Sequence, residues 1–300
     1  MQTLANLKRR IDSTEELHSV VKTMKSLAAV NIRQYEKAVE SLKEYFRTID
    51  MALGIVLRHN PDTAIYAKRS ERKRIGAFLF GSDQGMCGSL NEQVVSHAVE
   101  TLRPEKNASD EIPVVCAGER ASGILEDSGF EPAETWELPG SVASITSRVQ
   151  DVLLKIEQWR ERKGVDHVML FHARQESRAG YKPHTVHLLP IDARWLQVRK
   201  KQKWESRSLP FFTLPPDTLF SALIREYLFM AVFRAYVESM ASENAARLAA
   251  MQGAEKNIEE LMDDLNGTYH RLRQMSITEE LLDIVSGFEA LKQDSESTRL

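Results

Sequence analysis

A short loop that contains three glycines could hold a phosphate group. The loop reads Gly81-Ser-Asp-Gln-Gly85-Met-Cys-Gly88-Ser-Leu-Asn91 and follows Ile75–Phe80, an apolar run typical of a buried strand. Turns of this kind can present backbone N–H groups to phosphates at the start of a helix. The spacing is not the dinucleotide fingerprint, however, and the loop lacks the G-K-S/T of a P-loop. Asp83 would also place a carboxylate beside the phosphate, and the two negative charges would repel each other unless a cation lay between them. We therefore favour a structural turn with Asn91 or Ser89 as N-cap of the following helix.

Cys87 in this loop could act as a nucleophile, because a thiol at a strand-to-helix turn can have a lowered pKa. The nucleophile-elbow pattern requires G-x-C-x-G, and Ser89 stands at the last position. No base partner is indicated, so we expect a small buried thiol. Two cysteines, Cys87 and Cys116, cannot form a disulfide framework in a chain of 300 residues, which favours a reducing compartment.

Four histidines on two expected strands could suggest a metal site: His167, His172, His184 and His187. Spacings of five and three place the members of each pair on opposite faces of a strand. We therefore expect no metal site here.

The composition is that of a globular protein with 42% hydrophobic and 28% charged residues. A net charge of −3 gives no general attraction to nucleic acid or to anionic membranes. We accordingly interpret the basic run Arg199–Lys203, beside Trp204, as a solvated strand or loop edge. No run approaches the roughly 20 apolar residues of a membrane span. Met1–Arg10 lacks the apolar region of a secretory signal, so we expect none.

The middle of the chain, residues 75–213, must position the glycine loop. Expected strands and helices alternate along it, which predicts an α/β fold with a mostly parallel, Rossmann-like sheet. The expected strands are 75–80, 113–117, 166–172 and 185–190, and the expected helices are 91–102, 119–127 and 142–162.

Both ends of the chain predict very long helices. Residues 4–57 contain no proline and one glycine, and no proline follows Pro216. Helices of roughly 80 and 110 Å cannot be buried in a compact core, so we expect them to pair as an antiparallel coiled coil. The expected segments are 1–58, 75–213 and 215–292.

Two seven-residue ladders mark the expected seam on each helix. The N-terminal ladders are Leu17, Met24, Asn31, Ala38, Tyr45, Ala52 and Val21, Ala28, Tyr35, Leu42, Ile49, Val56. The C-terminal ladders are Leu223, Met230, Val237, Asn244, Met251, Ile258, Leu265, Leu272 and Leu219, Glu226, Phe233, Met240, Arg247, Ala254, Leu261, Thr268, Met275. Their small and polar members fit either an imperfect coiled coil or a shaft that partly faces a partner, and the ladders alone do not separate the two.

The N-terminal helix and the glycine loop resemble the gamma subunit of F-type ATP synthases. Leu7–Ser13, Thr23–Ala29 and Arg33 are similar to the family's I-x-x-R-I-x-S … A-M-x-M-V-A-A … R. Ser82–Gly88 with Asn91 looks like the turn S-D-R-G-L-C-G-G-x-N.

The C-terminal helix extends the resemblance. Ser242–Met251 with Asn257 is similar to S-E-x-x-A-R-M-x-A-M…N, and Arg273–Gly287 is similar to R-Q-x-x-I-T-x-E-I/L-x-E-I-V-x-G. The matching segments stand in the family's order at both ends and in the middle of the chain.

The resemblance implies a central rotor stalk that couples ion flow through a membrane c-ring to ATP synthesis or hydrolysis. The coiled coil would enter a ring of alternating alpha and beta subunits, and the α/β domain would rest on the epsilon subunit and the c-ring. The resemblance implies that the family's contacts with the beta subunits are made here by Met24, Arg247, Arg273, Gln274 and Thr278. The chain itself would hold no catalytic, cofactor or metal site and would lie peripherally at the cytoplasmic face of a bacterial plasma membrane.

Departures from the family pattern suggest a divergent bacterial branch: Glu16-Leu17, Asn31, Gln84, Ser89 and His270. Two alternatives remain, an unrelated coiled-coil scaffold with an α/β domain and an α/β enzyme that uses the loop Gly81–Asn91. Neither accounts for the C-terminal motif.

Overall fold

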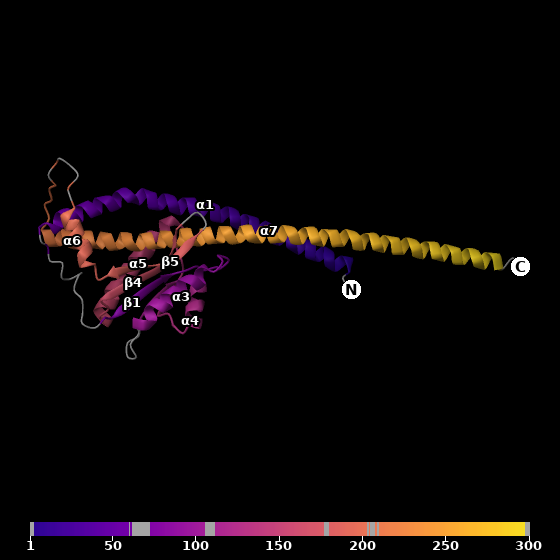
Figure 1. Cartoon of the computed structure of the whole chain (residues 1–300), viewed down its shortest axis with the longest axis horizontal. Helices are drawn as coiled ribbons and strands as arrows, with labels where there is room; N and C mark the ends of the chain where they lie inside the picture. Colours follow the sequence, from indigo (N-terminus) through magenta and orange to yellow (C-terminus); the bar gives the residue numbers. More distant parts are fainter. Residues whose placement is uncertain are drawn as a thin grey trace. The chain divides into compact units, whose positions relative to one another are not determined.

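The computed structural model describes residues 3–59, 61, 73–105, 112–176, 180–202, 204, 208 and 210–297. The chain divides into two compact units (Figure 1). We call 27–250 the sheet unit and 1–26 with 251–300 the helical unit. Each contains a part of two long helices, α1 (Leu4–Leu57) and α7 (Pro216–Ser297).

The sheet unit contains a five-stranded sheet of order β3-β2-β1-β4-β5. Its strands are β1 (Ile75–Phe80), β2 (Val114–Ala117), β3 (Glu134–Trp136), β4 (His167–Gln175) and β5 (Tyr181–Leu189). The first four are parallel, and β5 runs antiparallel to β4. The mostly parallel α/β sheet is thus confirmed, although β3 was not expected and β5 begins four residues before the expected strand.

The central strand β1 is buried on both faces, because helices cover each side of the sheet. Ala77 and Leu79 pack with α3 (Leu90–Leu102) and α4 (Glu119–Asp127). Phe78 and Phe80 pack on the other face with α5 (Val142–Lys163), α1 and α7. The period-two alternation of β1 therefore divides the core into two layers.

The basic run lies at the end of a helix, where we expected a strand or loop edge. Helix α6 (Ala193–Lys201) is capped by Asp192, whose carboxylate accepts a hydrogen bond from the Arg194 N–H at 2.8 Å. Arg199 to Lys201 form the last turn, where basic side chains favour the helix dipole. Arg199 is also paired with Asp50 of α1 at 3.0 Å. Lys203 lies outside the described residues.

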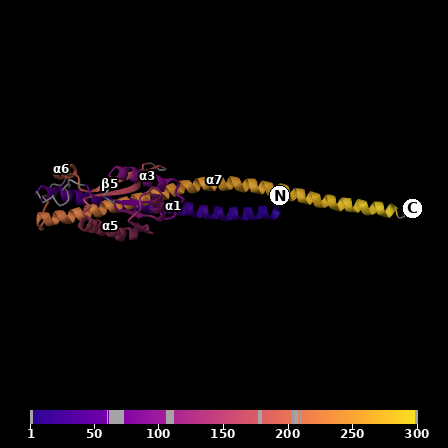
Figure 2. The ribbon, with the colours of Figure 1, turned by 90° about the horizontal axis from the view of Figure 1, so that it is seen from below.

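Helices α1 and α7 pair antiparallel in both units, and the two views show them running side by side (Figures 1 and 2). In the sheet unit, Asn31 donates to Asn244 at 3.2 Å and Tyr45 donates to Glu226 at 2.9 Å. In the helical unit, Leu7 and Ile11 pack with Leu265, Tyr269 and Leu272. The rising numbers on α1 meet falling numbers on α7, as an antiparallel pair requires.

One of the two expected ladders of α1 is only partly confirmed, because four of its six members are buried or half-buried and two are exposed. The ladder from Val21 to Val56 is buried or half-buried, but Leu17 and Tyr45 of the other ladder are 53% and 42% exposed. The second row of the seam is His18, Lys25, Ile32, Val39, Phe46 and Leu53, all buried or half-buried. Its polar members concealed it, because their partners lie on α7 and cannot be identified from periodicity.

Gly118, between β2 and α4, is required by a close backbone contact. Its φ is +116°, and a Cβ there would lie 2.7 Å from the Ser82 carbonyl oxygen and 2.8 Å from the Ser82 nitrogen. Gly123 lies within α4, is exposed, and has no atom within 4 Å of a built Cβ.

These two glycines form a matched pair. We expect Gly118→Ala to lower the free energy of unfolding by about 2–5 kcal/mol, because the backbone is strained and the Ser82 segment must shift. Gly123→Ala should raise it by about 0.5–1 kcal/mol, because alanine favours the helix interior. Urea unfolding followed by circular dichroism measures both. Equal effects of the two substitutions would contradict this reading.

Candidate functional site

The glycine loop is held by a buried side-chain network. Asn91, in the first turn of α3, accepts a hydrogen bond from the Ser82 N–H at 3.0 Å and donates to Ser82 Oγ at 2.8 Å. Ser82 is fully buried and Asn91 is 2% exposed. Ser89 occupies the N-cap position without a side-chain cap bond, and Asn91 lies inside the helix. Of the two expected N-caps, Ser89 is therefore correct by position although its side chain makes no capping bond, and Asn91 is wrong because its side chain turns back to the loop.

Asp83 occupies the place where an anion would bind. Its carboxylate accepts hydrogen bonds from the backbone N–H of Glu119, the first residue of α4, and of Leu138, both at 3.2 Å. A helix N-terminus attracts negative charge, and here the chain supplies that charge itself. The loop is thus built to join β1, α4 and the segment after β3, rather than to hold a phosphate at this helix end.

Cys87 is the small buried thiol that we expected. It is 1% exposed, and its sulfur lies 3.6 Å from Ser82 Oγ. Burial raises the pKa of the Cys87 thiol, and burial raises that of Cys116 to about 12. Both thiols are therefore protonated near neutral pH and unsuited to nucleophilic attack.

Arg247 of α7 joins the glycine loop to the long helix. Its guanidinium donates to the Gly85 carbonyl at 3.2 Å and to Glu243, one turn earlier on α7. The two side chains are only 14% and 8% exposed. Burial raises the pKa of Glu243, while the charge and hydrogen bond of Arg247 oppose that rise. Because this ion pair is buried, substituting either residue should destabilise the fold, since the remaining charge would be buried without a partner.

His172 and His184 lie opposite each other on β4 and β5, with ring centroids 5.4 Å apart. Our argument from spacing within a strand missed this contact, because the two residues meet across neighbouring strands. Burial lowers the pKa of His172 to about 4, and its Nε2 lies 3.9 Å from Glu238 of α7. His167 instead contacts its neighbour Asp166 at 2.8 Å.

Of the expected partner-binding residues, four lie in the helical unit and Arg247 lies in the sheet unit. Met24 is half-buried on α1, and Arg273, Gln274 and Thr278 are exposed on α7. Thr278 Oγ1 donates to the Gln274 carbonyl at 2.8 Å, which fixes these two residues on one face one turn apart. Their roles toward a partner stay a prediction.

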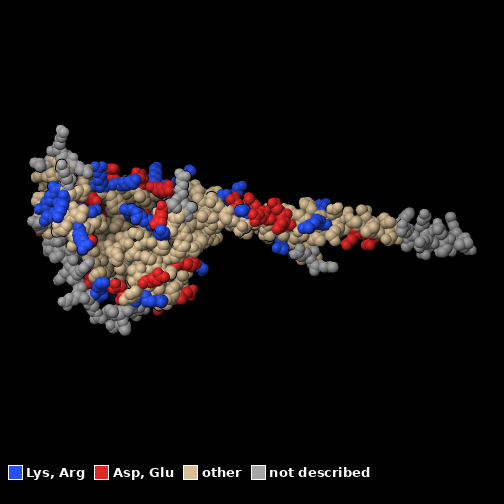
Figure 3. All heavy atoms as spheres, viewed as in Figure 1, with Lys and Arg blue, Asp and Glu red and all other residues tan. Residues whose placement is uncertain are grey.

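The same part of α7 exposes a row of large apolar side chains, which we call the α7 apolar row. The described surface along this part of the helix is mostly uncharged (Figure 3). The row consists of Met275, Ile277, Leu281, Leu282, Ile284 and Val285, each 48–68% exposed. Apolar surface gathered in this way is typical of a protein-binding site.

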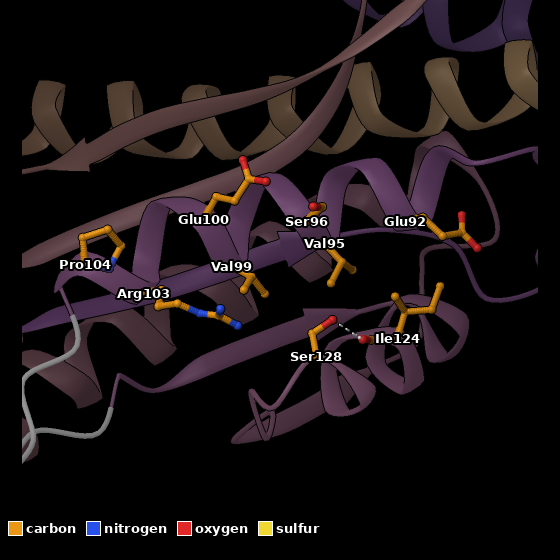
Figure 4. A pocket seen from close by; sticks show the side chains of 9 residues that line it. All are labelled: Glu92, Val95, Ser96, Val99, Glu100, Arg103, Pro104, Ile124 and Ser128. Atoms are coloured by element: carbon orange, nitrogen blue, oxygen red, sulfur yellow. Dashed lines mark hydrogen bonds between the residues drawn. The ribbon is translucent and has the colours of Figure 1, made fainter.

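A cavity of about 760 Å³ opens between α3 and α4 (Figure 4). Val95 and Val99 of α3 face Ile124 of α4, and Glu92, Glu100 and Arg103 add charges of both signs. Ser128 Oγ is engaged with the Ile124 carbonyl at 2.8 Å. This mixed lining of apolar side chains and charges of both signs is typical of a surface hollow.

Asn91 provides a test of the loop network. We expect Asn91→Ala to lower the free energy of unfolding by about 2–4 kcal/mol, because the buried Ser82 N–H loses its partner. Labelling of Cys87 by a thiol reagent should become faster in native conditions. Gln93→Ala, which removes an exposed side chain of the same helix, is the control and should change stability by less than about 0.5 kcal/mol. Unchanged labelling in Asn91→Ala would refute the network.

His172 predicts a fall in stability on acidification. The unfolded histidine binds a proton near pH 6.5 and the folded one only near pH 4, so the unfolded state binds more protons between these values. The free energy of unfolding should therefore drop by up to about 3 kcal/mol as the pH falls from about 6.5 to about 4. Urea unfolding at several pH values should show a shallower drop in His172→Asn, whereas the exposed control His187→Asn should keep the full drop. A drop unchanged in His172→Asn would assign it to other groups.

Comparison with known proteins places this geometry in a family. A family model described as ATP synthase matches residues 3–291. The ATP synthase gamma chain of Heliobacterium modesticaldum is 27% identical over 97% of this chain and its own full length. That of Syntrophobacter fumaroxidans is 28% identical over 98% of this chain and also over its full length.

Solved structures share the fold. A chain in the Euglena gracilis mitochondrial ATP synthase structure of OSCP/F1/c-ring in rotational state 3 superposes with a TM-score of 0.64 at 19% identity, covering 96% of this chain and 94% of that one. A chain in the rotor of the same enzyme in rotational state 1 gives 0.61 at 19% identity, over 91% of this chain and 98% of that one. Because the family model spans nearly the whole chain and the gamma chains match over their full length, this protein belongs to the ATP synthase family as a gamma chain.

Proposed function

We propose that this chain is the central rotor stalk of a bacterial ATP synthase and contains no catalytic site of its own. The observation that carries the proposal is the family match over residues 3–291, which includes both long helices and the sheet. The α7 apolar row adds physical support, because a helix surface of this kind requires a partner to cover it. The segments 1–58, 75–213 and 215–292 are its proposed domains.

The proposed beta-subunit contacts are Met24, Arg247, Arg273, Gln274 and Thr278. Arg273 and Gln274 are exposed and offer donors to carboxylates or carbonyls of a surrounding ring. Arg247 already bonds within the chain, so a partner's carboxylate would have to share the guanidinium with Glu243. The guanidinium has five N–H donors, and both bonds within the chain come from Nη2, so donors remain for such a contact. The Nε donor is buried without a partner among the described residues.

The absence of catalysis is proposed from the loop chemistry. Asp83, Asn91 and Ser82 all use their polar atoms to hold the chain together. The neighbouring thiol of Cys87 is kept protonated by burial. In this proposal nucleotide chemistry belongs to the alpha and beta subunits, and the stalk changes their conformations by turning.

The proposed location is the cytoplasmic face of the plasma membrane, reached through the epsilon subunit and the c-ring. In the part of the chain that the structure describes, no helix has the length and apolar content that crossing a membrane requires. Attachment through partner proteins is the arrangement that the proposal requires.

The test is a pull-down of the tagged chain from native membranes in mild detergent, followed by mass spectrometry and an ATPase assay. We expect alpha, beta, epsilon and c subunits to be recovered with the intact chain. Leu281→Asn combined with Ile284→Asn should lower recovery of alpha and beta at least about tenfold, because each exposed apolar side chain contributes on the order of 1–2 kcal/mol when a partner buries it. Truncation after Leu272 should abolish the ATPase activity recovered.

Val198→Asn is the matched control, since Val198 is 62% exposed on α6, outside the α7 apolar row. It should leave recovery of alpha and beta unchanged. Recovery of none of these subunits with the intact chain would refute the rotor function and favour the scaffold. Equal losses in the α7 double variant and in the control would refute the role of the apolar row.

A further inference from the structure

Three potential metal ligands meet across the two helices of the helical unit. His18 belongs to α1, and Glu255 and Glu259 stand one turn apart on α7. One ligand atom of each lies within 4.8 Å of the other two, and His18 Nε2 is 3.7 Å from a Glu259 oxygen. The i, i+4 spacing places both carboxylates on the face of α7 that meets His18. Among the described residues this is the one group of histidine, cysteine and carboxylate side chains gathered closely enough to hold an ion.

The imidazole of His18 has a nitrogen without a partner. Its Nε2 is buried and makes no hydrogen bond with any described group, because 3.7 Å to Glu259 is too long for one. A buried polar atom left in this way costs stability unless a ligand or water satisfies it. The Glu259 side chain is 61% exposed, so solvent and ions can reach the cluster from that side.

Lys25 is the competing cation at this place. Its ammonium group bonds to one oxygen of Glu255. A bound cation would replace Lys25 as the positive charge beside Glu255.

We propose that His18, Glu255 and Glu259 form a site for a divalent transition-metal ion of the zinc type that bridges α1 and α7. One imidazole and two carboxylates suit zinc, with water completing the tetrahedron on the exposed side. The imidazole disfavours magnesium and calcium, which take oxygen ligands. Binding displaces Lys25 from Glu255 and ties the two helices together, so the ion stabilises the folded chain by mass action.

The experiment is a calorimetric titration of the full-length chain with zinc chloride, together with thermal unfolding at several zinc concentrations. We expect one zinc ion per chain and a rise in Tm that increases with free zinc, while magnesium at equal concentration gives no rise. His18→Gln and Glu259→Gln should each weaken zinc binding at least about tenfold, because each removes a ligand. Lys25→Gln should tighten zinc binding, which a purely structural ion pair would not do.

His270→Gln is the matched control, because His270 is an exposed histidine on α7 in the same unit. It should leave the zinc affinity unchanged. The proposal is overturned if the chain binds no zinc, if His18→Gln and Glu259→Gln bind as tightly as the parent chain, or if Lys25→Gln binds no more tightly. Binding that persists in the first two variants would assign the zinc to another site, such as the buried thiols.

Discussion

The packing of α7 against one face of the sheet is the interaction on which the sheet unit depends. Ser239 Oγ donates to the carbonyl of Phe80 at the end of β1, and Ser242 Oγ donates to the carbonyl of Ala173 in β4, both at 3.2 Å. The ring centroids of Tyr236 and Phe80 are 4.3 Å apart. Small serine and alanine side chains let the helix backbone approach the sheet, and the hydroxyls provide partners for carbonyl groups buried there.

This contact explains why the composition of α7 changes along its length. Between Ala235 and Ala246 nearly every side chain is buried, so most side chains on every side of the helix are apolar or small, with Glu238, Glu243 and Asn244 as the exceptions. From Met251 to Leu265 only every seventh side chain is buried, and some of the residues between are half-buried. This pattern is typical of a helix that packs against a single partner helix. Beyond Leu272 nearly all described side chains are exposed, including the α7 apolar row. One continuous helix therefore serves three environments, and its sequence follows each in turn.

The sequence predicted the elements whose signal is local. Strand β1 is a continuous apolar run, and the long helices are free of internal proline, so both were identified with nearly correct ends. Strand β3 was missed because its three residues, Glu-Thr-Trp, show no alternation to detect. The seam row of α1 that we did not predict has a different cause. His18 and Lys25 fill seam positions only because Glu259 and Glu255 lie opposite, and such pairing across distant segments leaves no periodic signal.

Two of the segments that carry the family resemblance, the glycine loop and the motif Ser242–Met251 of α7, meet in the sheet unit. Arg247, from the motif on α7, contacts Gly85 in the glycine loop, whose own residues are held by Asn91. Asn31, one of the departures from the family pattern, bonds to Asn244 of the same α7 motif at 3.2 Å. A polar pair within a seam favours one register of the two helices. The glycine loop, the α7 motif and this pair therefore fix the position of α7 along both the sheet and α1. Residues that look like a phosphate site in the sequence serve instead to lock a long helix to its support, which is the mechanical requirement of a part that transmits torque.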